Sequence, residues 1–167
     1  MECKAMFRTL LPQAGLLFIF LTAAGPAEKY TGAWPPKPDV PYLVHADNLI
    51  ETEAAEAKNE DRGNQRTAWV AGVASPVRTP LAEPIFLIDV QKLVPEKIEL
   101  YRFDVKRERR EVSLQLKAGK GASRALRLTV TRVEGKLYRL EANEALENGE
   151  YSLSPDGSDQ VFCFQVY

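Results

Sequence analysis

Apolar and polar residues alternate in short runs along the second half of the chain. Every second residue is apolar within residues 111–117, and residues 126–131 repeat this pattern. A period of two is typical of strands with one buried and one solvated face. Residues 85–90 form an apolar run instead, which predicts a strand covered on both faces.

Further short strands, separated by turns, are predicted in the same half of the chain. They lie at residues 98–105, 137–142, 150–154 and 160–167. The first of them places Tyr101, Phe103 and Val105 on one face. Residues 106–110 form the tip of a hairpin, and residues 155–159 form a second strong turn. Alternating short strands at near-regular spacing predict an antiparallel β-sandwich of about seven to nine strands.

Residues 43–60 allow two interpretations. Residues 51–58 are rich in good helix formers. Residues 61–65 have the composition of a turn, and residues 67–73 that of a strand. A hairpin across that turn makes 49–58 a strand as well. We favour the hairpin, with the helix as the alternative.

A local motif refines the sandwich prediction. Residues 146–153 resemble the tyrosine corner of immunoglobulin-like domains, in which a tyrosine hydroxyl bonds to backbone upstream of it. Tyr151 is the corner residue, and Leu153 stands where antibody domains carry a disulfide cysteine. The predicted fold class is therefore all-β: an immunoglobulin-like antiparallel β-sandwich held by packing alone.

The N-terminal segment has the order of a secretory signal peptide. Lys4 and Arg8 precede a short apolar core at residues 16–21, and small residues follow it. Cleavage after Ala24 or Ala27 satisfies the small-residue rule, and we favour Ala27. The apolar core is shorter than the roughly 20 residues that span a bilayer, so no stable transmembrane segment is expected after cleavage. A retained N-terminal anchor is the alternative.

The chain therefore divides into three parts. Residues 1–27 are assigned to a signal-peptide helix, residues 28–42 to an extended leader rich in Pro and aromatic residues, and residues 43–167 to the sandwich. Four prolines within residues 35–41 forbid a helix in the leader. The expected location is periplasmic or extracellular.

Composition changes the picture only by exclusion. The chain has 167 residues, 45% hydrophobic and 27% charged, with a net charge of −1, as expected for one globular domain. It has one His, His45, and two Cys, of which Cys3 lies in the signal segment. Cys163 lies in an apolar strand, which predicts a buried, inert thiol. A lone His supports neither a catalytic triad nor a zinc site, so we expect no cofactor, no metal and no enzyme activity.

Charge is distributed unevenly along the chain. Residues 98–139 hold twelve Lys or Arg against five Asp or Glu, whereas residues 140–167 hold none against six, and residues 28–63 hold four against eight. Pairing of basic with acidic strands is the favoured explanation. The alternative is a basic patch that binds an anionic partner. The patch consists of Lys106, Arg107, Arg109 and Arg110.

Two segments resemble a known group of sequences. Residues 149–155 with residues 161–166, and the opening at residues 41–49, look like exported bacterial proteins of uncharacterised function with an immunoglobulin-like β-sandwich. The resemblance spans most of the chain after the signal. It implies export and a β-rich fold, and it implies no activity and no site residue.

A non-catalytic binding or assembly module is the function that these features favour. The candidate partner-binding residues are Trp34 and Tyr42 of the leader and the four cations of the hairpin tip. The expected partner is another envelope protein or an anionic polysaccharide. Export and the lack of aromatic residues among these cations argue against nucleic acid.

Three alternatives stay open. A carbohydrate-binding module is one, with Trp34, Trp69 and Tyr138 as exposed aromatics. A small envelope hydrolase is another, with paired carboxylates or His45. Strand exchange through an uncovered edge of the last strand, which ends at Tyr167, is the third.

Overall fold

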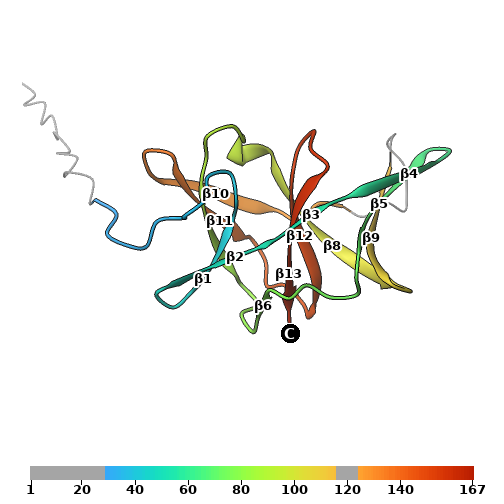
Figure 1. Cartoon of the computed structure of the whole chain (residues 1–167), viewed down its shortest axis with the longest axis horizontal. Coiled ribbons are helices and arrows are strands. Elements are labelled where there is room, and N and C mark those ends of the chain that lie inside the picture. The colour runs from blue at the N-terminus through green and yellow to red at the C-terminus, as the bar shows by residue number, and fades with distance from the viewer. Residues whose placement is uncertain (1–28, 116–123) are drawn as a thin grey trace, which may run out of the picture.

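The computed structural model describes residues 29–115 and 124–167 (Figure 1). Their regular secondary structure is almost entirely β-strand, with one short 3-10 helix at Pro95–Lys97. None of the helical structure within these ranges is long and apolar enough to cross a membrane. The predicted signal peptide and its cleavage sites lie outside the described residues.

The first of two sheets has the strand order β10-β11-β7-β1-β2, and all of its pairs are antiparallel. Its strands are β1 (Tyr42–His45), β2 (Asn48–Glu51), β7 (Ile85–Asp89), β10 (Leu128–Glu134) and β11 (Leu137–Ala142). The apolar residues Phe86, Leu87 and Ile88 of the central strand β7 are all buried, which confirms the prediction of a strand covered on both faces.

The second sheet has the order β3-β13-β12-β8-β9-β5-β4, with β6 added beside β13 as the only parallel pair among the described residues. Its strands are β3 (Glu53–Glu56), β4 (Lys58–Arg62), β5 (Gln65–Ala71), β6 (Arg78–Thr79), β8 (Ile98–Lys106), β9 (Arg109–Gln115), β12 (Gly149–Pro155) and β13 (Gln160–Val166). The two sheets form a sandwich-like arrangement, so the all-β sandwich prediction is confirmed. The described residues form thirteen strands rather than about seven to nine, in part because residues 42–62 divide into four short strands.

The main core lies between the two sheets. Phe86 of the first sheet packs against Phe164 of the second, with ring centroids 4.8 Å apart, and Tyr151 stacks on Phe164 at 5.5 Å. Leu43 and Leu153 are fully buried in the same cluster. Burial of each such side chain stabilises the fold by about 1.5–3 kcal/mol, so this cluster explains how the two sheets are held together while Cys163, the cysteine of the described residues, is free.

The second sheet is curled, and the strands at its two ends, β3 and β4, follow one another in the sequence. β3 pairs with β13 at one end and β4 pairs with β5 at the other, yet only Ala57 separates β3 from β4. Figure 1 shows β3 and β4 running on as one line across this curled sheet. The sheet therefore surrounds an interior of its own.

A second apolar cluster fills part of that interior, and we call it the inner cluster. It consists of Val70, Phe103, Val112, Val161 and Cys163. Strands of the curled sheet consequently bury both faces: on β8, Ile98 and Leu100 face the main core, whereas Phe103 faces inward. Alternate side chains of such a strand therefore point into two different cores, rather than into one core and into solvent.

The region before β5 and the end of β8 differ in how well they match the predicted strands. Residues 48–62 form the strands β2, β3 and β4, and β4 and β5 form a hairpin across Gly63 and Asn64. The hairpin is therefore confirmed and the helix is wrong, although only Lys58–Arg62 of the predicted strand pairs with β5, because β2 and β3 pair with β1 and β13. Val105 shares a face with Phe103 as expected but is 50% exposed, because β8 runs beyond the inner cluster towards the hairpin tip.

The expected bond from the Tyr151 hydroxyl to upstream backbone is present. The Tyr151 hydroxyl donates a hydrogen bond to the backbone carbonyl of Glu147 at 2.7 Å, four residues upstream, and the Tyr151 side chain is buried. The bond ties the segment that enters β12 to the strand itself.

The prediction of an uncovered edge on the last strand is wrong. β13 pairs with β12 along one side, and along its other side it pairs with β3 through Gln160–Cys163 and with β6 through Gln165 and Val166. Its backbone groups are therefore engaged on both sides, which leaves no free edge there for strand exchange.

The leader packs along the first sheet. The Asp39 carboxylate accepts hydrogen bonds from the backbone N–H groups of Gln91, Lys92 and Leu93 at 2.8–3.1 Å. Although burial on its own favours the neutral acid, these donors hold the pKa of Asp39 below its ordinary value. These hydrogen bonds to Asp39 hold the leader against the loop that follows β7.

Replacing Tyr151 with Phe removes the corner bond while keeping the ring. We expect the free energy of unfolding to fall by about 1 kcal/mol, because the Glu147 carbonyl loses one net hydrogen bond. Urea unfolding measures the change. Tyr138→Phe is the matched control, since the half-buried Tyr138 hydroxyl has no hydrogen-bond partner among the described residues; a loss as large in the control would contradict the prediction.

Candidate functional site

The predicted basic patch is divided by the fold. Lys106 lies 2.7 Å from Glu111, and Arg109 contacts both Glu111 at 2.8 Å and Glu60 at 3.0 Å. Arg107 is exposed at the tip with a left-handed backbone (φ 56°). Three of the four cations therefore lie near the surface, and two of these are neutralised by carboxylates.

Arg110 requires a correction, because it is not part of any surface patch. Only 1% of it is exposed, and its guanidinium lies inside the curled sheet. Alternation along β9 explains this: Arg110 points to the same side as the buried Val112, whereas Arg109 points outward. The sequence pattern placed four cations in one tip but did not separate the two faces of the strand.

Charge pairing explains part of the uneven charge, but its three pairs do not join neighbouring strands of the sheet as the favoured explanation requires. Basic residues of the middle of the chain pair with acidic residues of both ends, in Arg109–Glu60, Arg110–Glu53 and Arg102–Glu147. The hairpin β4–β5 carries its own bidentate pair of Arg66 with Asp61.

The aromatic candidates have different environments. Tyr42 is buried and donates a hydrogen bond to Glu51, so it offers no surface to a partner. Trp34 is 45% exposed beside Tyr30. The ring of Trp69 lies 5.1 Å from Lys58 Nζ and 5.1 Å from the Arg109 guanidinium, and these cations occupy the surface on which a sugar would stack.

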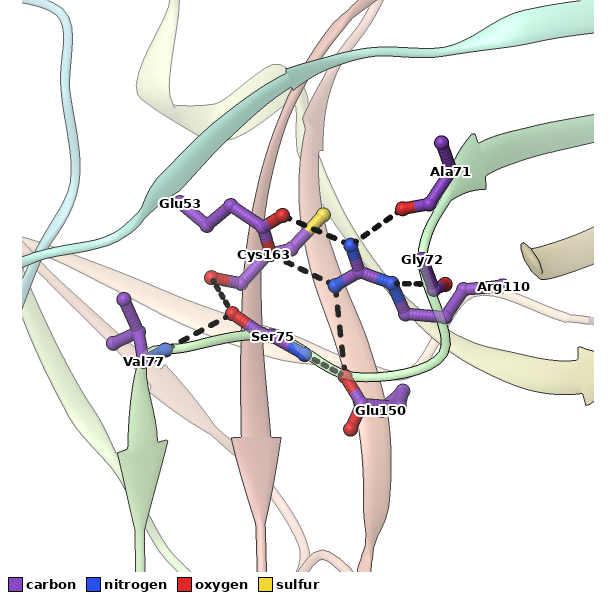
Figure 2. A network of polar contacts seen from close by, with 8 residues as sticks. All are labelled: Glu53, Ala71, Gly72, Ser75, Val77, Arg110, Glu150 and Cys163. Carbon is purple, nitrogen blue, oxygen red and sulfur yellow. Dashed lines mark hydrogen bonds and ion pairs between the residues drawn. The ribbon is translucent and has the colours of Figure 1, made fainter. Parts of the chain in front are cut away.

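Arg110 forms the centre of a buried polar cluster at one end of the interior (Figure 2). Its guanidinium donates to both carboxylate oxygens of Glu53 at 2.8 and 2.9 Å and to the carbonyls of Ala71 and Gly72 at 3.1 and 3.2 Å. Glu150 lies 3.6 Å away on the other side. The cluster joins β3, β5, β9 and β12, and it closes this end of the interior.

Two groups beside Arg110 complete the cluster. Ser75 donates its backbone N–H to Glu150 at 2.9 Å and its hydroxyl to the carbonyl of Cys163 at 3.3 Å. The second carboxylate oxygen of Glu150, Oε1, is buried without a partner. Burial raises the pKa of the Cys163 thiol to about 12, as the prediction of an inert thiol requires.

The two carboxylates of the cluster are shifted in opposite directions. Burial disfavours the charge on both, but hydrogen bonds from Arg110 hold the pKa of Glu53 below its ordinary value. For Glu150, burial outweighs the backbone donor and the nearby guanidinium, so its pKa is raised. One guanidinium therefore serves chiefly as the partner of Glu53.

The opposite end of the interior holds a cavity of about 380 Å³, which we call the inner cavity. It exists because β8 and β9 are hydrogen-bonded only at Asp104–Lys106 and Arg109–Glu111 and separate beyond them. Small side chains on the surrounding strands leave the space open. They are Ala57, Ala68, Ser152 and Ser154.

Apolar and polar groups share the lining of the inner cavity about equally. Phe103, Val112 and Leu114 belong to its walls, with Tyr101 beside them. The Tyr101 hydroxyl donates to Glu99 at 2.5 Å, and burial together with this bond raises the pKa of the phenol. Ionisation of Tyr101 is thereby disfavoured, so the residue acts as a neutral wall.

Two other polar groups of the rim are also engaged. Asn59 donates to Asp159 at 2.9 Å, and Arg66 is held by Asp61. A wider hollow of about 1050 Å³ lies on the outer side of Tyr101, but it is less enclosed, and its wall includes Arg124, the first described residue after residue 115. The inner cavity is therefore the better-formed candidate site.

None of the sequence candidates lies in the inner cavity. The small residues of the cavity do not stand out in the sequence, because alternating strands commonly contain them. The one sequence feature that could have indicated the cavity is the spacing of Ser152 and Ser154, which places two hydroxyls on the same face of β12, and that face is buried. His45 is exposed at the end of β1, and within the described ranges no three His, Cys, Asp or Glu side chains gather as metal ligands. Comparison with protein-family models, curated proteins and solved structures finds no match to this chain.

Glu53→Gln is expected to lower the free energy of unfolding by about 3 kcal/mol, because it leaves a buried guanidinium without its charged partner. Glu150→Gln removes a carboxylate whose burial already disfavours its charge, and we expect a smaller loss. Urea unfolding of both variants at pH 7 makes the comparison. Equal losses would show that Arg110 does not depend chiefly on Glu53.

The raised pKa of Glu150 gives a prediction with a definite sign. The folded protein holds this proton at pH values where the unfolded chain, with an ordinary pKa of 4.5, has released it. The contribution of Glu150 to the free energy of unfolding is therefore fully present below pH 4.5, and it is lost as the pH rises through the raised pKa of the folded state. We expect the unfolding free energy of the wild type, minus that of Glu150→Gln, to decrease between pH 4 and pH 7. A constant difference would contradict this assignment.

Proposed function

We propose that this protein is a non-catalytic, exported binding module that holds a small, largely apolar ligand in the inner cavity. The observation that carries the proposal is the cavity itself, a partly open space of about 380 Å³ within a sheet that otherwise packs on both faces. Ligand sites are typically concave, mainly apolar, and of about 300–1,000 Å³, with a few polar groups.

The site is supported by a rigid frame. Its walls belong to strands on all sides of the curled sheet, and the Arg110 cluster closes the far end of the interior with a bidentate ion pair. A ligand would enter past Tyr101 and Asp159 at the rim. Binding would then require little movement of the strands, which lowers its entropic cost.

The finer fold and location belong to the same proposal. The bond from Tyr151 to Glu147 and the two-sheet packing support an immunoglobulin-like sandwich. The charged, apolar and small-residue order of residues 1–27 supports export to the periplasm or beyond.

Binding of an envelope protein or an anionic polysaccharide at the hairpin tip is the second candidate. The observation that favours it is Arg107, which is exposed and lies within 4 Å of no carboxylate among the described residues. Neutralisation of Lys106 and Arg109 weakens the attraction of the tip for an anion, so the inner cavity is preferred.

A matched pair of substitutions tests the proposed function. Ala68→Leu fills the inner cavity, whereas Ala54→Leu adds the same side chain at an exposed position of β3. The uncharged fluorophore N-phenyl-1-naphthylamine is expected to bind the wild type saturably. We expect Ala68→Leu to weaken its binding at least about tenfold, or 1.4 kcal/mol, and Ala54→Leu to leave it unchanged.

Thermal unfolding of both variants provides the control, since overpacking costs about 1–3 kcal/mol. Unsaturable binding to the wild type, or equal binding to both folded variants, would reject the inner cavity as the ligand site.

A further inference from the structure

The inner cavity contains a pair of hydroxyls whose hydrogen bonding is incomplete. Ser152 and Ser154 are two residues apart on β12, so both side chains lie on the inner face, and both line the cavity. Their Oγ atoms are 3.1 Å apart. Ser152 is only 1% exposed, so bulk water does not reach it freely.

One hydroxyl hydrogen of this pair has no acceptor. Each serine has one O–H, and a single bond between two hydroxyls uses one of the two hydrogens. No other hydrogen bond to either Oγ atom is found among the described residues. An unsatisfied buried donor costs about 1–3 kcal/mol, and the cavity is the space into which this hydrogen can point.

Two other hydroxyls line the cavity, those of Ser158 and Tyr101. Ser158 is exposed in the turn after β12, away from the apolar walls, and the hydrogen of Tyr101 is already used. The Tyr101 hydroxyl donates to Glu99, so it cannot also donate to a ligand without giving up a charge-assisted bond. The serine pair is therefore the donor best placed to orient a ligand within the apolar walls.

The rim argues against a negatively charged ligand. Glu99, Asp156 and Asp159 all line the opening, whereas Arg66, the one cation that lines it among the described residues, is held by Asp61. An anion would meet three carboxylates and no free counter-charge among the described lining residues. The acceptor of the ligand should thus be a neutral oxygen.

We infer, on the basis of the proposed function, that the ligand is an uncharged amphiphile whose carbonyl, hydroxyl or ether oxygen accepts a hydrogen bond from the Ser152–Ser154 pair. Its apolar body, such as a ring system, lies against Phe103, Val112 and Leu114. The pair selects for the oxygen, and the walls select for the body.

Three probes with one ring system test the inference: 2-acetylnaphthalene, which has a neutral acceptor, 2-ethylnaphthalene, which has none, and 2-naphthoate, which carries a carboxylate. Dissociation constants are measured by NMR titration of the full chain after the signal. We expect the acetyl probe to bind about five-fold more tightly than the ethyl probe, and the carboxylate to bind most weakly.

The double variant Ser152→Ala/Ser154→Ala should bind the acetyl and ethyl probes equally. Ser113→Ala is the control, because Ser113 lies on β9 between two cavity residues but faces away from the cavity, and it should keep the five-fold preference. The preference in the wild type is informative even if the double variant unfolds.

The outcomes separate this inference from the proposed function. Binding of both neutral probes that Ala68→Leu abolishes, but without preference for the acetyl group, would overturn the ligand class and leave the cavity as a binding site. Tightest binding of 2-naphthoate would also overturn the class. Failure of all three probes to bind would overturn the proposed function and the inference together.

Discussion

Closure of the second sheet by the segment from Glu53 to Arg62 is the constraint on which the other features depend. The first part of this segment pairs with β13 and the last part with β5, so strands from the two ends of the sheet are held around a common interior. Without this closure the inward faces of β8, β9 and β12 would be solvated. The inner cluster, the Arg110 cluster and the inner cavity exist because those faces are enclosed.

The same closure explains how a buried arginine is tolerated. Glu53 stands at the start of the closing segment and reaches Arg110 across the interior with two hydrogen bonds. The backbone carbonyls of Ala71 and Gly72 accept further hydrogen bonds from the guanidinium. These bonds offset part of the free-energy cost of removing its charge from water. The Arg110 cluster occupies one end of the interior and the inner cavity the other, so the apolar inner cluster lies between them.

Prediction from sequence succeeded where the pattern is local. Alternation located the strands, the turn at Gly63 supported the hairpin β4–β5, and the spacing around Tyr151 anticipated its bond to Glu147. The candidate site was not reached in this way. Lys106, Arg109 and Arg110 looked alike in sequence, yet one is buried and two are neutralised, because their partners Glu53, Glu60 and Glu111 are set by strand pairing.

The amino-acid sequence by itself determined that the chain forms short antiparallel strands, that Cys163 is buried, and that basic and acidic segments complement one another. These properties follow from periodicity and composition, which act over a few residues. Only the tertiary structure decided what covers each face: a period of two shows that Ser152 and Ser154 share a face but not that the face encloses a cavity. That depends on residues about 50 to 100 positions away, such as Phe103 and Ala57, brought together by sheet closure.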